Sequence, residues 1–297
     1  MRTEGYSRRI PFLIYFMLGV SVAGPAQRSN SVPPDKDDVM VAAVSRDGCM
    51  FCGGIGPGRG TEPGTVVVEQ MGYLTQSGQW RILPCGKNAP KTCPKFAREY
   101  LSKPHNYIVV SANGQGTAIQ AAPTKLSECR DYSGPGTYSG AALANSAIAA
   151  SSADLFSESE PLRPLSNQDS ESIRKALGRL VPQKLDSARW LKVFSLHMQG
   201  QDLFIAQRVY TDIAAHTDAR YDFVFAIGTR DQGRFRLRRW KVNTEDEEER
   251  ILGTIRLKTG RDFLITTVND PESQWFRVYG MRDGKLTLVF EGGGSSC

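Results

Sequence analysis

Two of the six cysteines have a spacing that is associated with chemistry. Cys49 and Cys52 are separated by two residues, as in redox-active dithiols and in many zinc sites. A redox dithiol lowers its thiol pKa by placing the first cysteine at the start of a helix, but the Gly-rich segment 53–58 is a poor helix former. A zinc site that adds Cys85 and Cys93 is a second alternative, although that pair lacks the usual close spacing.

Disulfide bonds are the interpretation that we favour for these cysteines. An even number of cysteines in an exported chain is typical of a disulfide framework. The predicted pairings are local: Cys85 with Cys93, and Cys49 with Cys52 or one of these two with Cys129. Cys297 could instead tether another molecule.

Acid–base catalysis has few candidate residues. The chain has only three histidines, of which His216 lies in a predicted loop close to Asp218. The segment 136–140 has the wrong spacing for a nucleophile elbow, and no phosphate-binding loop is recognisable. We therefore assign no catalytic, cofactor-binding or metal-ligating residue. The residues retained as functional candidates are His216, Asp218, Asp202 and Asp262.

An internal repeat organises the C-terminal third of the sequence. Segment 200–205 resembles 260–265, segment 223–226 resembles 276–279, and segment 233–237 resembles 284–288. Each copy predicts four strands joined by turns, and the equivalent residues Asp202 and Asp262 are predicted to stabilise turns by accepting backbone N–H bonds. Four-stranded units of this kind occur in β-propellers, but two copies cannot close a ring, so a small sandwich or barrel remains open.

The charged residues cluster in two neighbouring segments. Segment 234–240 alternates Arg with Phe and Leu, which predicts a strand with one face in the core and one in water. The acidic run 245–249 is predicted to be a solvated loop that compensates these arginines. The formal net charge is +6, and removal of residues 1–26, with three Arg and one Glu, lowers it to +4. Such a mild charge argues against a dedicated nucleic-acid binder.

The first 26 residues have the order of a signal peptide. Arg2, Arg8 and Arg9 precede an apolar run over residues 10–23, which is too short to cross a bilayer as a helix. Cleavage is predicted after Ala23 or Ala26, and the Sec and twin-arginine routes both remain open. We expect a periplasmic or extracellular protein without a membrane span after cleavage.

The remaining sequence divides by composition into four parts. They are a flexible Gly/Pro-rich leader (27–64), a β-rich N-terminal domain (65–152), a linker with a docking helix (153–188), and the duplicated β domain (189–297). The docking helix is predicted from apolar residues at helical spacing over 173–181, with Asp169 or Ser170 as its cap. A shorter helix is predicted over 94–101.

These patterns predict a mainly β protein with antiparallel sheets, a duplicated four-strand unit at the C-terminus and few short helices. The favoured function is a non-catalytic binding or structural module with an unknown ligand or protein partner and no cofactor. One alternative is a secreted hydrolase with a loop-borne site around His216 or the acidic run. A further alternative is a thiol-redox or zinc protein that uses the Cys49 and Cys52 pair.

Overall fold

The computed structural model describes residues 34–46, 64–84, 93–123, 133–139, 143, 145–180, 191–208, 223–231, 234–243, 247–270 and 273–296. Strands make up most of these residues, and each strand pair among them is antiparallel. The prediction of a mainly β fold with antiparallel sheets and few short helices is therefore confirmed.

The N-terminal strands form a closed barrel. Its six described strands are β1 (Val39–Ser45), β2 (Thr65–Leu74), β4 (His105–Val109), β5 (Ala118–Ala121), β6 (Ser133–Ser139) and β7 (Ser146–Ala150). The order around the ring is β1-β7-β4-β5-β6-β2, and β2 returns to pair with β1. The short strand β3 (Trp80–Arg81) adds to the end of β2. Closure of the ring pairs both sides of each barrel strand.

The barrel has an apolar interior and one apolar outer face. The short helix α1 (Cys93–Phe96) continues into a π-helical turn, η1 (Ala97–Leu101), and the two place Phe96 and Leu101 on the interior core. Strand β1 is buried at all seven positions, because its outward side chains pack against another sheet. Burial on both faces explains why β1 is a continuous apolar run rather than an alternating one.

The C-terminal half contains two four-stranded meanders. The first meander consists of β10 (Lys192–Met198), β11 (Gln201–Arg208), β12 (Phe223–Asp231) and β13 (Arg234–Asn243). The second meander consists of β14 (Glu248–Leu257), β15 (Asp262–Asn269), β16 (Ser273–Arg282) and β17 (Lys285–Ser296). Each meander thus consists of four consecutive antiparallel strands.

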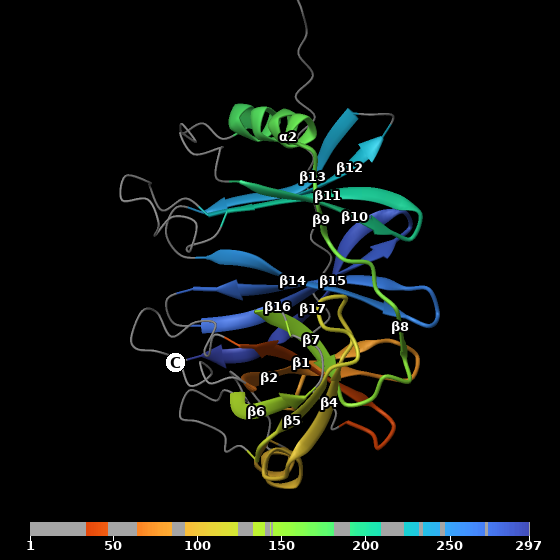
Figure 1. Ribbon diagram of the computed structural model, residues 1–297, viewed down its shortest axis with the longest axis vertical. Coiled ribbons are helices and arrows are strands. Elements are labelled where there is room, and N and C mark those ends of the chain that lie inside the picture. The colour runs from red at the N-terminus through yellow and green to blue at the C-terminus, as the bar shows by residue number, and fades with distance from the viewer. Residues whose placement is uncertain are drawn as a thin grey trace, which may run out of the picture.

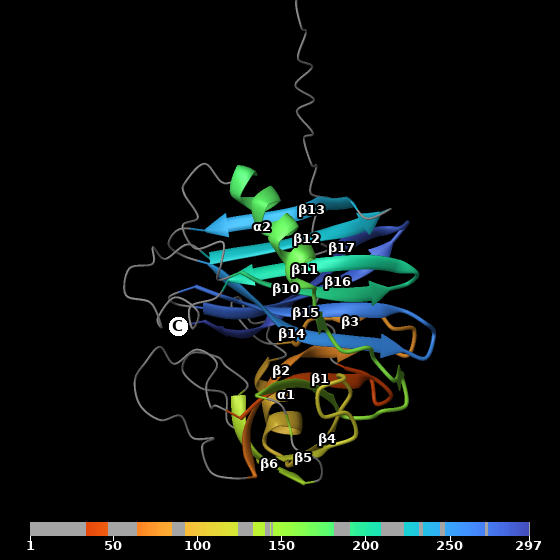
Figure 2. The same ribbon diagram turned by 45° about the horizontal axis from the view of Figure 1, so that its top comes forward.

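These elements stack in layers along the long axis of the molecule. Helix α2 (Asn167–Leu180), the first meander, the second meander and the barrel follow one another in that order (Figure 1; Figure 2). Apolar side chains such as Ile205 and Leu264 fill the space between the meanders. A second cluster joins Met71 and Ile148 of the barrel to residues such as Ile265 of the second meander. The second meander is therefore covered on both faces.

Helix α2 covers the outer face of the first meander. Ile173 and Leu177 are buried against residues such as Phe204, as their helical spacing predicted. The Ser166 hydroxyl accepts the backbone N–H of Asp169 at 3.2 Å. The prediction that Asp169 or Ser170 caps the helix is therefore wrong by a few residues, because Ser166 precedes the first helical residue.

The linker and the leader both contribute strands, contrary to our expectation. Within the segment predicted as a flexible leader, 39–45 forms the buried barrel strand β1. Within the linker, β8 (Phe156–Ser157) pairs with β14 and β9 (Arg163–Pro164) pairs with β10. The linker thus joins both meanders: β8 pairs with the edge strand β14 of the second meander, and β9 pairs with the edge strand β10 of the first meander.

Candidate functional site

Asp202 and Asp262 have equivalent surroundings in the two meanders. Each lies near the start of the second strand, directly opposite a basic residue of the first strand: His197 faces Asp202, and Arg256 faces Asp262. His197 Nδ1 lies 2.8 Å from Asp202 Oδ1. Arg256 Nε donates to Asp262 Oδ1 at 2.6 Å. The two aspartates therefore share a cross-strand pairing.

The two pairs differ in burial. The side chain of Asp202 is 68% exposed, whereas that of Asp262 is 8% exposed. Asp262 Oδ2 also accepts the backbone N–H of Gln199 at 3.1 Å, in the turn of the first meander. Gln201 Nε2 in turn donates to the carbonyl oxygen of Gly284, in the last turn of the second meander, at 2.9 Å. Asp262 thus accepts a backbone N–H bond as predicted, but the N–H belongs to the neighbouring meander. Together, the Asp262–Gln199 and Gln201–Gly284 hydrogen bonds join the two sheets.

The charge of Arg256 is stabilised by this arrangement. The hydrogen bond to Asp262 is the largest influence on it and raises the pKa of Arg256, while burial lowers it. Glu160 of the linker lies 3.8 Å from Arg256 Nη2 and adds a further favourable charge. Because Asp262 accepts hydrogen bonds from Arg256 of its own meander and from the backbone N–H of Gln199 in the other, its carboxylate is suited to holding the meanders together.

Arg277 on β16 lies among three carboxylates. Its Nη1 is 2.9 Å from Glu247 Oε1 and 3.1 Å from Glu249 Oε2, and its Nη2 is 3.1 Å from Glu291 Oε1. The guanidinium carbon also lies 5.7 Å from the centre of the Trp275 ring. Burial is the largest influence on the pKa of Arg277 and lowers it, but the carboxylates together outweigh burial and raise it.

Glu249 is a buried member of this Arg277 cluster, and it accepts hydrogen bonds from three different side chains. Besides Arg277, the Tyr279 hydroxyl donates to Glu249 Oε1 at 2.6 Å, and the Thr266 hydroxyl donates to the same oxygen at 2.8 Å. These residues occupy the face of the second meander that packs against the first meander. Glu249 is therefore a satisfied buried carboxylate, which is the condition for stable burial of a charge.

The acidic run does not form the solvated loop that the sequence predicted. Glu248 and Glu249 are buried residues of β14. Glu248 Oε1 accepts from Arg250 Nε at 2.7 Å, and Glu247 and Glu249 pair with Arg277. The prediction fails because these residues alternate between the two faces of a covered strand, and each face provides an arginine. Residues 245 and 246 lie outside the described part of the chain.

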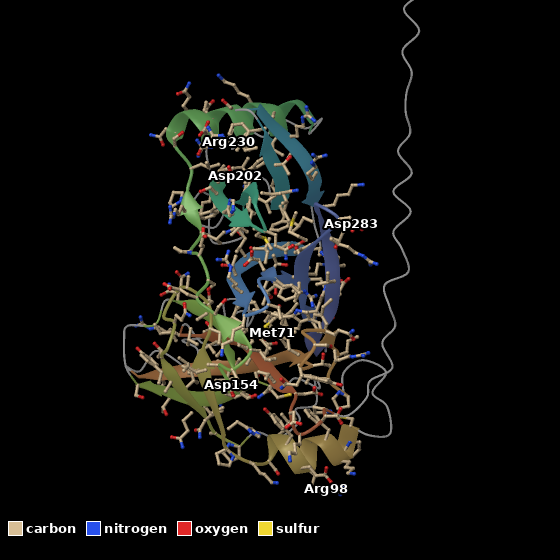
Figure 3. All side chains as sticks on the ribbon, turned by 90° about the vertical axis from the view of Figure 1, so that its right-hand side faces the viewer. Met71, Arg98, Asp154, Asp202, Arg230 and Asp283 are labelled. Atoms are coloured by element: carbon tan, nitrogen blue, oxygen red, sulfur yellow. The ribbon has the colours of Figure 1, made fainter. Side chains whose placement is uncertain are left out.

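Strand β13 has the two faces that its alternation predicted. Arg236 and Arg238 are exposed, while Phe235 and Leu237 are half-buried beside the α2 core. Arg238 Nε donates to the Thr229 hydroxyl at 3.2 Å. Arg230, on β12, lies 3.4 Å from Asp169 of α2. Figure 3 shows Arg230 on the side of the first meander that α2 covers.

A third polar group lies in the barrel. The rings of Tyr100 and His105 stack with centres 3.8 Å apart, and His105 Nε2 lies 2.6 Å from the Tyr100 carbonyl oxygen. The Tyr100 hydroxyl lies 3.2 Å from that of Tyr107, to which Gln70 Nε2 donates at 3.4 Å. Burial raises the pKa of Tyr100, and it also raises that of Tyr107. Both hydroxyls therefore remain protonated hydrogen-bonding groups at neutral pH.

Several sequence candidates fall outside the described residues. These are His216, Asp218, Cys49, Cys52, Cys85, Cys129 and Cys297. Cys93 is the one cysteine among the described residues, and it is buried on the barrel core. The pairing of Cys85 with Cys93 therefore stays a prediction, as do the redox and zinc alternatives.

Within the described ranges, no group of three or more His, Cys, Asp or Glu side chains is placed to hold a metal ion. In the same part of the chain, no helix has both the length and the apolar character to span a membrane.

The Arg277 cluster is the feature that sequence reasoning missed. A signal was present, because Trp275, Arg277 and Tyr279 alternate along one strand and Glu247 and Glu249 alternate along another. The two sets are well separated in the sequence, and only the pairing of β14 with β15 and of β15 with β16 places them on one face. Residue spacing alone could not match them.

Comparison with known proteins adds no relative to this description. No protein family matches the chain, and no curated protein or solved structure is significantly similar to it.

Proposed function

We propose that the chain is an exported, non-catalytic module that binds a partner or serves a structural role. The observation that carries this proposal is the use of buried charges to join layers. Asp262 links the two meanders, Glu249 and Arg277 form a closed ionic group beside the inter-meander core, and the buried amide of Gln274 donates to Glu69 of the barrel at 2.7 Å. A carboxylate that already accepts several hydrogen bonds is a poor proton acceptor for catalysis.

Of the two described histidines, His105 supports the same proposal. His105 is stacked on Tyr100 and lies within hydrogen-bond distance of its carbonyl oxygen, so its ring contributes to barrel packing. His197 pairs with Asp202 across two neighbouring strands.

A panel of ester, peptide and glycoside substrates tests the proposal directly. The mature chain is expected to turn over none of them, and turnover that disappears on mutation of one histidine or carboxylate would show that the chain is an enzyme.

A secreted hydrolase remains the second candidate because of the His197–Asp202 pair. The carboxylate lies at Nδ1 of the imidazole, which is the arrangement that orients a general base in hydrolases. His197→Ala and His216→Ala variants separate the two functions, since only a hydrolase would lose a measurable rate. His197 is included because of its contact with Asp202, and His216 is included because the sequence analysis retained it as a candidate base.

Export is the part of the proposal that rests on the N-terminal sequence. The order of basic residues, apolar run and small residues at Ala23 and Ala26 supports cleavage of a signal peptide. Expression of the full chain in a bacterium, followed by fractionation and N-terminal sequencing, tests it. A periplasmic product that begins at Gly24 or Gln27 is expected, and an uncleaved cytoplasmic chain would contradict it.

A disulfide framework completes the proposal. Two observations support it: Cys93 is buried on the barrel core, and Cys85 is its nearest cysteine in the sequence. Mass spectrometry of non-reduced peptides is expected to find this pair. Free thiols at Cys49 and Cys52, or stoichiometric zinc in the purified chain, would instead favour the redox or the metal alternative.

A further inference from the structure

Strand β13 forms an edge of the first meander. It ends the sheet order β13-β12-β11-β10-β9 and, among the described strands, pairs with β12 alone. The corresponding strand of the second meander, β17, packs one face against the barrel, where the ring of Phe290 lies 5.3 Å from that of Trp80. Figure 2 shows β13 at the margin of its sheet, beside α2. An edge strand presents backbone groups that can pair with a further strand.

The two faces of β13 differ in chemistry. Arg236 is paired in register with Thr229, and Arg238 donates to the same threonine, so both arginines lie on one face and both are exposed. Phe235 and Leu237 lie on the other face, where they are half-buried at the margin of the α2 core. A strand added beside β13 would therefore meet positive charge on one face and incompletely covered apolar surface on the other.

The carboxylates that could have neutralised this strand are engaged elsewhere. Glu248 pairs with Arg250, while Glu247 and Glu249 pair with Arg277. Asp169 pairs with Arg230 of β12. Within the described residues, no carboxylate lies within ion-pair distance of Arg236 or Arg238. The charge on this face is thus available to a partner.

We propose that the β13 edge binds an extended segment of another polypeptide, in which acidic residues alternate with apolar residues. Pairing with β13 supplies backbone hydrogen bonds, as in other cases of strand addition. Acidic side chains of the segment lie beside Arg236 and Arg238, and its apolar side chains cover Phe235 and Leu237. The inference rests on the proposed binding function and names the chemical class of the partner.

Charge distinguishes this partner from a second copy of the chain. Two β13 edges would bring arginines close to arginines, and like charges that face each other across strands are destabilising. The apolar face distinguishes the partner from a simple polyanion, which gains nothing from Phe235 and Leu237. In the described part of the chain, Val289 is the one large apolar side chain that is exposed, so the described surface provides no separate apolar patch.

Fluorescence anisotropy with labelled peptides tests the proposal on the full mature chain. The probes are a set of eight-residue peptides in which Asp or Glu alternates with Val, Ile or Leu, and a matched set with Lys in place of the acidic residues. Acidic peptides are expected to bind, with affinity that falls as salt is added, and Lys peptides are not. The double variant Arg236→Glu/Arg238→Glu is expected to weaken binding at least tenfold. Arg282→Glu/Lys285→Glu is the matched control, because it makes the same charge change at exposed residues of another hairpin.

Peptide N-methylation separates strand addition from charge attraction. Only alternate N–H groups of an edge-paired strand face its neighbour, so methylation of one alternate set is expected to abolish binding and methylation of the other set to preserve it. Equal binding by both methylated sets, or by inorganic polyphosphate of the same charge, would overturn the proposal. Absence of binding by every acidic peptide at millimolar concentration would also overturn it. These binding measurements do not involve substrate turnover. Turnover would contradict the proposed non-catalytic function, whereas loss of peptide binding would contradict only the proposed β13 site.

Discussion

Asp262 accepts a hydrogen bond from the backbone N–H of Gln199 at 3.1 Å, although the two residues belong to different meanders. Gln199 has a positive φ of 46°, so its N–H belongs to a sharply turned backbone between β10 and β11. The same carboxylate binds Arg256 within its own meander. One buried side chain therefore fixes the strand pairing of the second meander and its position against the first.

Asp262→Ala is expected to destabilise the protein far more than Asp202→Ala. The first variant leaves the guanidinium of Arg256 and the N–H of Gln199 without their partner, and loss of a hydrogen-bonded buried charge costs about 2–4 kcal/mol. The second variant removes an exposed pair and is expected to cost about 0.5 kcal/mol or less. Urea denaturation of both variants measures the difference. Equal losses would show that Asp262 does not join the meanders.

Arg277→Met is expected to cost about 3–5 kcal/mol, because it leaves three nearby carboxylates without their shared cation. Adding Glu249→Gln to this variant removes one of the uncompensated charges and is expected to restore part of the loss. A double-mutant cycle measured by urea denaturation gives the coupling between the two residues. Simple additivity of the two single variants would contradict the ionic cluster as described.

Tyr100 and Tyr107 are expected to make the barrel sensitive to alkaline pH. Burial raises the pKa of both groups in the folded chain, whereas in the unfolded chain it lies near 10. Above about pH 10 the unfolded state releases protons that the folded state retains. The contribution of these two tyrosines to the free energy of unfolding is therefore fully present below that pH and is lost as the pH rises. Each tyrosine contributes a slope of about 1.4 kcal/mol per pH unit.

The variant Tyr100→Phe/Tyr107→Phe isolates this contribution. The free energy of unfolding is measured between pH 8 and pH 11 for the wild-type chain and for the variant. The variant is expected to lose less stability above pH 10 than the wild-type chain does. An identical decline in both proteins would assign the alkaline sensitivity to other groups.

Local structure could be predicted from the sequence, but closure of the barrel and burial of the acidic residues could not. The alternation of Arg with Phe and Leu over 234–240 predicted strand β13, and Gly200 and Gly260 lie at positive φ in the turns that the sequence predicted beside Asp202 and Asp262. The pairing of β1 with β2 joins segments that are separated by a Gly/Pro-rich stretch, so the closed barrel had no local signal. Glu249 was expected in water because its partner Arg277 lies two strands away along the chain.

Each meander also places a glycine opposite a phenylalanine on the neighbouring strand. Gly228 faces Phe204, and Gly280 faces Phe263. A Cβ at Gly228 would overlap the Phe204 ring and the Arg236 carbonyl oxygen, whereas at Gly280 the nearest atoms are ring carbons of Phe263 at 3.2 Å. Both phenylalanine rings are almost completely buried. The first site is therefore much tighter than the second.

Gly228→Ala is accordingly expected to destabilise the chain by about 1–3 kcal/mol, as overpacking of a filled core does. Gly280→Ala is expected to cost less, because a shift of a few tenths of an ångström in the ring makes room for the methyl group. Urea denaturation of the two alanine variants under identical conditions provides the measurement. If Gly228→Ala were as stable as the wild-type chain, Phe204 could not be packed over Gly228 as the structure has it. Since Gly228 pairs with Leu237 of β13, the same variant should also weaken peptide binding at the β13 edge, while Gly280→Ala should leave that binding unchanged.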